Sequence, residues 1–221
     1  MRFIVSTSTL LKQLQAVNGA SSSSTVLPIL ENFLFEIKDG SLTISATDLQ
    51  TSMTTSLPVE SKEDGKVAVP SKILLETLKT LPDQPVAFSV DAQTFAIEIS
   101  AGDGKYKLSG ENGEDFPKIP TVENASSVSM PASVLAEAIN KTIFAVSNDD
   151  LRPAMTGVFC QLSPQNITFV ATDAHKLVRY RRNDTKSDAA ASFILPKKAL
   201  TLLKASLGSY DSAVSLEYNS T

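Results

Sequence analysis

The sequence predicts an α+β protein made of two copies of one domain, with helices on one face of antiparallel sheets. The phrase Leu42–Asp48 recurs as Ile167–Asp173, which places Asp48 and Asp173 125 residues apart. In both copies, leucine-rich stretches with helical spacing alternate with short strand-like runs. A period this long exceeds that of solenoid repeats, so the chain is predicted to contain two duplicated domains.

Within each copy, a unit of strand, helix and three further strands is predicted to occur twice. In the first unit, residues 3–5 are strand-like and a helical stripe follows at Leu10, Leu14 and Val17. A hairpin is then predicted at 33–46, because alternating apolar residues flank Lys38-Asp39-Gly40. The two helices of each copy are expected to pack on the same side of the sheets.

The other three helices are each expected to begin after a proline. These prolines are Pro70, Pro131 and Pro196, since proline is tolerated at the start of a helix. The first is expected to end at Pro82 and the last at Gly208. Their apolar stripes are Leu74, Leu78 and Leu81; Leu135, Ile139 and Ile143; and Leu200, Leu203 and Leu207.

Two domains are predicted, at residues 1–123 and 124–221. The prolines in 117–120 and the polar residues up to Ser127 are typical of a linker. Copy one contains strand-like runs at 95–99 and 106–108 that have no counterpart before Thr221, so the second domain is expected to be incomplete.

Composition excludes several classes of protein. The chain has 221 residues, of which 42% are hydrophobic and 20% are charged, as in ordinary globular proteins. It shows neither an N-terminal leader nor an apolar run of membrane-spanning length, so a cytoplasmic location is expected. The single cysteine, Cys160, is expected to be buried in the core. No cofactor or metal is expected, because no histidine and cysteine cluster has ligand spacing.

Positive charge is concentrated on the predicted helices. The chain carries a net charge of −4, yet the four helical segments together are basic. Basic helices on one side of a repeated domain suggest a surface that faces a polyanion.

Three features point to one known family: Leu27–Leu30, the duplicated Ala-Thr-Asp phrase and, above all, Ala171–Leu177. In these features the chain resembles the bacterial sliding clamps, the β subunits of the replicative DNA polymerase III. The resemblance implies a DNA clamp fold and a non-catalytic processivity factor. Two full-length subunits would form a ring around duplex DNA and tether the polymerase III catalytic subunit, the clamp loader and other proteins that carry a clamp-binding motif. This chain would contain the first domain and most of the second, with a third domain absent.

The resemblance also implies two sets of site residues. The lysines expected to face DNA lie on helices, and Ser24 stands in a loop where the family commonly has arginine. Asp149, in the matching loop of copy two, is expected to repel phosphate unless Lys141 offsets its charge. The DNA-facing set is Lys12, Lys72, Lys79, Lys141, Lys197, Lys198 and Ser24, and the partner-peptide set is Met155, Thr172, Ala174, His175, Lys176 and Leu177.

Two peptide-site residues depart from the family pattern. Ala174 replaces a glycine, and its methyl group is expected to constrain the turn. Lys176 replaces an arginine, so it keeps the charge but loses the planar fork.

Other readings remain open. Asp173 and His175 could form the acid/base pair of a small cytoplasmic hydrolase, or the chain could be a peptide-binding scaffold with no DNA role. For the Thr-Asp pairs themselves, the expected role is hydrogen bonding to neighbouring backbone. Gly102–Lys105 is expected to be a hairpin turn, because it lacks the spacing of a phosphate-binding loop.

Overall fold

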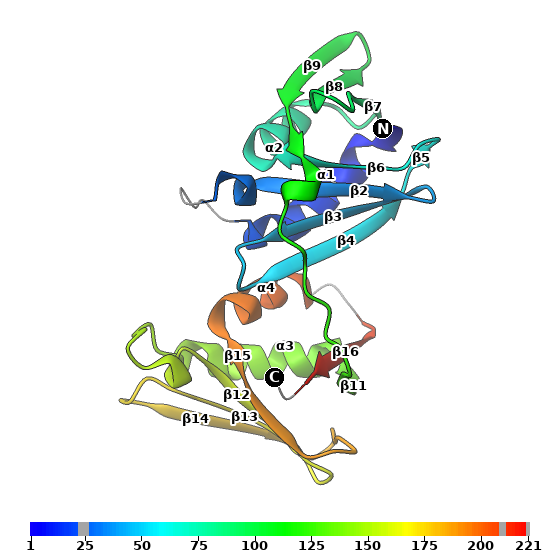
Figure 1. Cartoon of the computed structure of the whole chain (residues 1–221). Helices are drawn as coiled ribbons and strands as arrows, with labels where there is room; N and C mark the ends of the chain where they lie inside the picture. Colours follow the sequence, from blue (N-terminus) through cyan, green and yellow to red (C-terminus); the bar gives the residue numbers. More distant parts are fainter. Residues whose placement is uncertain (22–26, 208–210, 220–221) are drawn as a thin grey trace. The chain divides into compact units, whose positions relative to one another are not determined.

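The chain folds into two compact units, Met1–Ile119 and Pro120–Thr221 (Figure 1). The structure is a computed structural model, and it describes residues 1–21, 27–207 and 211–219.

The first unit contains the same order of elements twice. Its first half consists of β1 (Arg2–Ser6), α1 (Thr7–Val17), β2 (Asn32–Lys38), β3 (Ser41–Thr47) and β4 (Ser52–Pro58). Its second half consists of β6 (Gly65–Pro70), α2 (Ser71–Thr80), β7 (Pro85–Val90), β8 (Ala96–Ala101) and β9 (Gly104–Ser109). Two short strands, β5 (Glu60–Ser61) and β10 (Glu111–Asn112), extend the sheets.

The two halves of this unit exchange their first strands. The sheets have the orders β5-β1-β7-β8-β9 and β10-β6-β2-β3-β4, so β1 lies in the sheet of the second half and β6 in that of the first. Phe3 pairs with Phe88 across β1 and β7, and their rings stack with centroids 4.7 Å apart. The hydrophobic core therefore joins both halves.

The helices of the first unit bury one apolar stripe each, as the periodicity predicts. Leu10 and Leu14 of α1 and Leu74 and Leu78 of α2 are fully buried, and the two helices pack against each other. Helix α2 ends at Thr80, so the predicted last stripe residue, Leu81, lies outside it.

The second unit repeats this arrangement. Its elements are β11 (Ser126–Pro131), α3 (Ala132–Thr142), β12 (Gly157–Leu162), β13 (Ile167–Thr172), β14 (Leu177–Arg182), β15 (Ala191–Pro196), α4 (Lys197–Leu207) and β16 (Ala213–Tyr218). The strands form a sheet of order β14-β13-β12-β15 and the pair β11-β16, and α3 packs against α4. The fold class is confirmed: antiparallel sheets with paired helices, built from repeated units.

Details differ from the sequence-based expectation at several element ends. Strand β11 begins at Ser126, inside the predicted linker. Ile143 follows the end of α3, and Phe95 precedes β8 with a φ of +56°. Gly208, the expected end of α4, lies outside the described residues.

Two predictions about single features hold. Cys160 is fully buried, and burial raises the pKa of its thiol to about 12. Gly102 and Asp103 form the turn of the β8-β9 hairpin rather than a phosphate loop.

No helix in the described part of the chain is long and apolar enough to cross a bilayer.

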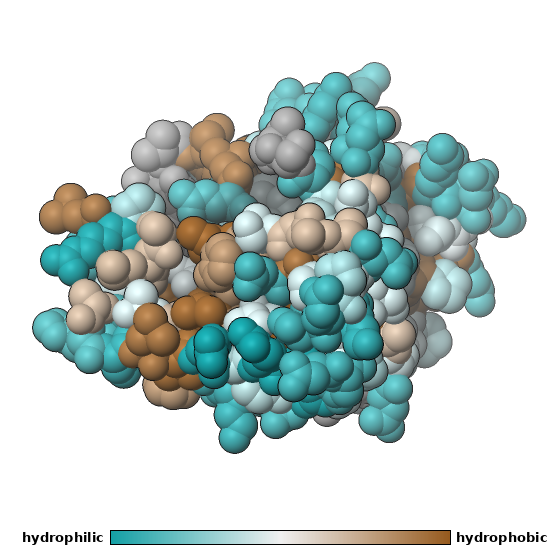
Figure 2. Space-filling model, turned by 90° about the horizontal axis from the view of Figure 1, so that it is seen from below, coloured by the Kyte–Doolittle hydropathy of each residue, from teal (hydrophilic) through white to brown (hydrophobic). Residues whose placement is uncertain are grey.

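Some large apolar side chains remain on the surface. In the view from below, brown apolar groups form patches among teal hydrophilic ones (Figure 2). In the second unit the exposed ones are Val122, Phe144, Leu151, Phe159, Leu177 and Ile194.

Candidate functional site

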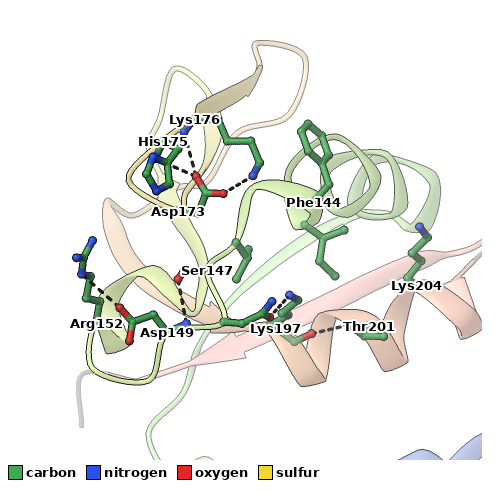
Figure 3. A pocket seen from close by; sticks show the side chains of 13 residues that line it. Phe144, Ser147, Asp149, Arg152, Asp173, His175, Lys176, Lys197, Thr201 and Lys204 are labelled. Atoms are coloured by element: carbon green, nitrogen blue, oxygen red, sulfur yellow. Dashed lines mark hydrogen bonds and ion pairs between the residues drawn. The ribbon is translucent and has the colours of Figure 1, made fainter.

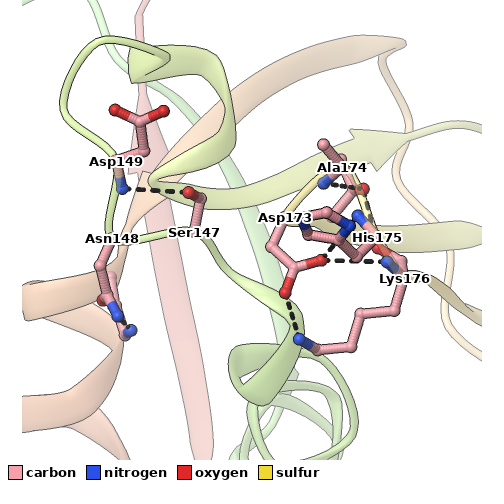
Figure 4. A network of polar contacts seen from close by, with 9 residues as sticks. Ser147, Asn148, Asp149, Asp173, Ala174, His175 and Lys176 are labelled. Carbon is pink, nitrogen blue, oxygen red and sulfur yellow. Dashed lines mark hydrogen bonds and ion pairs between the residues drawn. The ribbon is translucent and has the colours of Figure 1, made fainter.

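The turn between β13 and β14 is built by the side chains of Thr172 and Asp173. The Thr172 hydroxyl donates to the Lys176 carbonyl at 2.8 Å and accepts from the Ala174 N–H at 3.1 Å. Asp173 Oδ1 accepts from the N–H groups of His175 and Lys176 at 3.1 and 3.0 Å (Figure 4). These bonds satisfy the backbone of a tight turn and fix the direction in which β14 leaves it.

The first unit contains the same turn between β3 and β4. Thr47 Oγ1 accepts from the Leu49 N–H at 3.0 Å, and Asp48 Oδ1 accepts from the Thr51 N–H at 2.7 Å. The predicted role of the duplicated Thr-Asp pairs, bonding to neighbouring backbone, is therefore confirmed in both copies.

Ala174 adopts a left-handed backbone conformation in this turn. Its φ is +75°, a region that disfavours residues with a Cβ atom. The expectation that a methyl group constrains this turn thus has a structural basis, because glycine would adopt the same conformation without steric cost.

Asp173 is held in its charged form. Bonds from the Lys176 ammonium, and then from the Lys176 and His175 backbone N–H groups, keep the pKa of this carboxyl well below its usual range. Within the described chain, no hydrogen bond joins the Asp173 carboxylate to the His175 imidazole. No group of three potential metal ligands occurs among these residues either. The carboxylate supports the turn, and the hydrolase reading is not supported.

A pocket of about 780 Å³ lies beside the turn (Figure 3). Three segments line it: residues 143–152, the turn itself, and the exposed side of α4. The turn contributes Asp173, His175 and Lys176, and α4 contributes Lys197, Thr201 and Lys204.

The loop on one side of the pocket is ordered by its own polar groups. Ser147 Oγ accepts from the Asp149 N–H at 3.0 Å, and Lys197 Nζ donates to Asn148 Oδ1 at 2.6 Å. Arg152 Nε lies 3.4 Å from Asp149 Oδ2. The cation that pairs with Asp149 is therefore Arg152 rather than the expected Lys141.

Five of the six predicted peptide-site residues lie in the turn or directly beside it, at Thr172 and 174–177, but they are divided between two surfaces. Only His175 and Lys176 line the pocket. Thr172 and Leu177 are paired across β13 and β14 and therefore share the opposite face of the sheet. Leu177 is 68% exposed there. Met155, half-buried, accepts from the Ser147 N–H at 2.9 Å through its carbonyl.

Sequence reasoning missed Phe144, which lines the pocket, and the exposed Leu151 in the loop that lines it. Phe144 is 61% exposed and Leu151 is 92% exposed, although both are large and apolar. The signal was present in Asn148–Arg152, a polar turn interrupted by a single leucine. Its position beside α4 depends on tertiary structure and could not be derived from spacing.

The helix lysines lie away from the core. Lys12, Lys72, Lys79, Lys141 and Lys198 are all exposed, and Lys197 is half-buried because it reaches back to Asn148. Within each unit, the two lysine-bearing helices pack side by side. Ser24 lies outside the described residues.

Models of one protein family match nearly the whole chain. The model of the DNA polymerase III beta subunit N-terminal domain matches residues 1–120, and that of its central domain matches residues 129–221. The chain belongs to the DNA polymerase III beta subunit family.

Curated relatives and solved structures agree with this family. The beta sliding clamps of Halalkalibacterium halodurans and Bacillus subtilis are each 28% identical over 92% of the chain. The crystal structure of the Bacillus subtilis sliding clamp superimposes over 100% of the chain with a TM-score of 0.94 at 26% identity, and the match covers 60% of that protein. A Pseudomonas aeruginosa clamp bound to griselimycin gives a TM-score of 0.89 at 28% identity, over 97% of this chain and 58% of that one. The chain spans 56% of the length of the first two relatives.

Proposed function

We propose that this beta subunit chain is the DNA-encircling and partner-binding part of a sliding clamp. The observation that carries the proposal is the family match across both units. In this proposal residues 1–123 and 124–221 are the first two clamp domains, and the full-length protein forms a homodimeric ring. The protein is non-catalytic and acts in the bacterial cytoplasm at the replication fork.

The helix lysines are the proposed contact with duplex DNA. A clamp must move along DNA, so it needs contacts to phosphate rather than to base edges. Lysines on flexible stems suit this task because they are point charges that do not require one fixed geometry. The proposed set is Lys12, Lys72, Lys79, Lys141, Lys197 and Lys198, together with Ser24.

The proposed partner site surrounds the β13-β14 turn. Leu177 supplies an exposed apolar contact, and His175 and Lys176 supply polar edges on the pocket side. A short peptide with a leucine and an aromatic residue matches this chemistry. The proposed partners are the polymerase III catalytic subunit, the clamp loader and other proteins with a clamp-binding motif. The proposed residues are Met155, Thr172, Ala174, His175, Lys176 and Leu177.

The clamp proposal is tested by polymerase processivity. With a bacterial replicative polymerase and a clamp loader, the full-length protein is expected to lengthen the product made in one binding event. The matched control is linear DNA with free ends, from which a ring slides off and on which the gain should disappear. Equal product length with and without the protein would contradict the proposal.

A further inference from the structure

The outer face of the four-stranded sheet in the second unit carries an exposed apolar row. The register places Arg179 beside Val170, Val170 beside Phe159, and Phe159 beside Ile194. The adjacent row, which includes Phe169 and Cys160, turns inward and is buried. Phe159 is 37% exposed and Ile194 is 42% exposed, so this row crosses all four strands at the surface.

Gly157 leaves room for the Ile194 side chain on this face. A Cβ added at Gly157 would lie 2.6 Å from Ile194 Cγ2 and 2.5 Å from the Leu195 carbonyl oxygen. Since both distances are below any normal contact, only glycine leaves this space free. A larger residue at position 157 would therefore displace Ile194 or the β15 backbone.

The same face is positively charged. Arg179 and Arg181 project from β14 on this side, and no outward-facing side chain of the four strands is acidic. Arg181 Nε donates to Thr168 Oγ1 at 3.2 Å, whereas Arg179 has no hydrogen bond or ion pair to any described residue. On the inner face, by contrast, Arg182 pairs with Glu137 and Asp184.

The row is continuous with the proposed peptide site. Leu177 precedes Arg179 by two residues on β14, so the two side chains share one face of the sheet. Thr172 and Val170 are likewise two residues apart on β13. A peptide that contacts Leu177 and Thr172 would therefore lie next to the exposed row.

We propose that this outer sheet face, formed by Val170, Phe159, Ile194, Arg179 and Arg181, binds the acidic and apolar residues that flank the motif in the same partner protein. The inference rests on the proposed peptide site and extends it. The apolar row would cover the flanking aliphatic or aromatic side chains, and the arginines would pair with carboxylates in the geometry that guanidinium groups favour.

The test is a nuclear magnetic resonance titration of the nitrogen-15-labelled 221-residue chain. One synthetic peptide contains only a core with a leucine and an aromatic residue. Two longer peptides carry the same core and an extension of alternating aspartate and leucine, one at the N-terminal end and the other at the C-terminal end. In the matched controls, serine and glycine replace the residues of the extension. Backbone amide shifts report binding residue by residue, so weak binding is measurable and its location is known.

The core peptide is expected to shift amides around His175 and Leu177 only. One acidic extension should also shift those of Phe159, Val170 and Ile194, and bind about fivefold more tightly than its serine and glycine control. The additional amide shifts and the tighter binding should both disappear in Arg179→Gln and Phe159→Ser. Both should persist in the control variants Arg2→Gln and Val122→Ser, which alter exposed residues elsewhere. Arg179→Gln changes a surface side chain, so it keeps the test valid if Phe159→Ser fails to fold.

The two proposals fail in different ways. If the core peptide shifts its amides but neither extension reaches the outer sheet face, the inference is overturned and the peptide site stands. If no peptide shifts any amide of the second unit, both are overturned. Concentration-dependent shifts of the outer sheet face without peptide would assign it to a second copy of the chain, which also overturns the inference.

Discussion

Leu49 and Ala174 occupy equivalent places in the two duplicated turns, and each has a φ of +75°. In both, the residue follows a Thr-Asp pair whose threonine hydroxyl accepts from its N–H. Neither residue is glycine, so both turns maintain a conformation that side chains disfavour. The hydrogen bonds of the Thr-Asp pair offset that cost.

Replacing Ala174 by glycine should stabilise the second unit. We expect a net gain of roughly 0.5 kcal/mol, because relief of about 1–2 kcal/mol of left-handed strain is partly offset by about 0.5–1 kcal/mol of glycine entropy in the unfolded chain. Urea unfolding at neutral pH measures the difference. The control is Ala16→Gly on helix α1, where the same change should destabilise by roughly 0.5–1 kcal/mol. Equal losses of stability at both positions would show that the turn is not strained.

The contribution of Asp173 to stability should depend on pH. Its folded-state pKa is depressed, so this contribution is present above the unfolded pKa of about 3.9 and is lost as the pH falls through the lower folded value. Asp173→Asn should therefore destabilise the protein at pH 7. The difference in unfolding free energy between this variant and wild type should become smaller below that unfolded pKa. Parallel unfolding curves at several pH values measure it. Asp103→Asn, in the β8-β9 turn, controls for the change in net charge. If the difference in unfolding free energy between Asp173→Asn and wild type does not change with pH, the charge of Asp173 does not stabilise the turn.

Removing helix lysines should flatten the salt dependence of DNA binding. Changing Lys72, Lys197 and Lys198 to alanine should reduce the slope of log affinity against log salt by up to about 0.9 for each phosphate that is no longer neutralised. Fluorescence anisotropy of a labelled duplex at low ionic strength measures this slope. The control with the same charge change replaces Lys38, Lys62 and Lys186, which are exposed outside the helices. If the two triple variants show the same slope of log affinity against log salt, the lysine-bearing helices do not face DNA.

Removing His175 and Leu177 should weaken binding of the partner peptide. The double change to alanine takes away an exposed apolar side chain and a pocket-lining ring. A weakening of less than about twofold, roughly 0.4 kcal/mol, would contradict the assignment of the peptide site to this turn. Isothermal titration of the full-length protein with the core peptide measures the affinity. Ile4→Ala, an exposed position in the first unit, is the control.

Periodicity predicted the helices better than the strands. Leu10, Leu14 and Val17 located α1, because a helix satisfies its backbone locally and shows its buried stripe in sequence. Strand β14 was not located, since three of its six residues are arginines and its inward-facing residues are Val178, Tyr180 and the charged Arg182. The sequence also could not show that β1 pairs with β7, because strand pairing across the chain leaves no local signal.

The candidate site was predicted in part. The residues around the turn were identified through resemblance, and the Thr-Asp hydrogen bonding followed from side-chain chemistry alone. The division of His175 and Leu177 between two faces was not foreseen, because it depends on where β13 ends and β14 begins. The pairing of Arg152 with Asp149 likewise required the loop's folded path.

The exchange of first strands has a consequence for how the protein folds during synthesis. Arg2–Ser6 leaves the ribosome first, yet it pairs with Pro85–Val90, which is made much later. The sheet β5-β1-β7-β8-β9 cannot close until that distant segment is available, and pairing over such a separation is entropically slow. Until then its available partner is the two-residue strand β5, so we expect β1 to remain largely unpaired through most of the synthesis of the first unit. The two halves share one order of elements, but each supplies a strand to the sheet of the other. We therefore expect the whole unit to be the smallest segment that folds on its own.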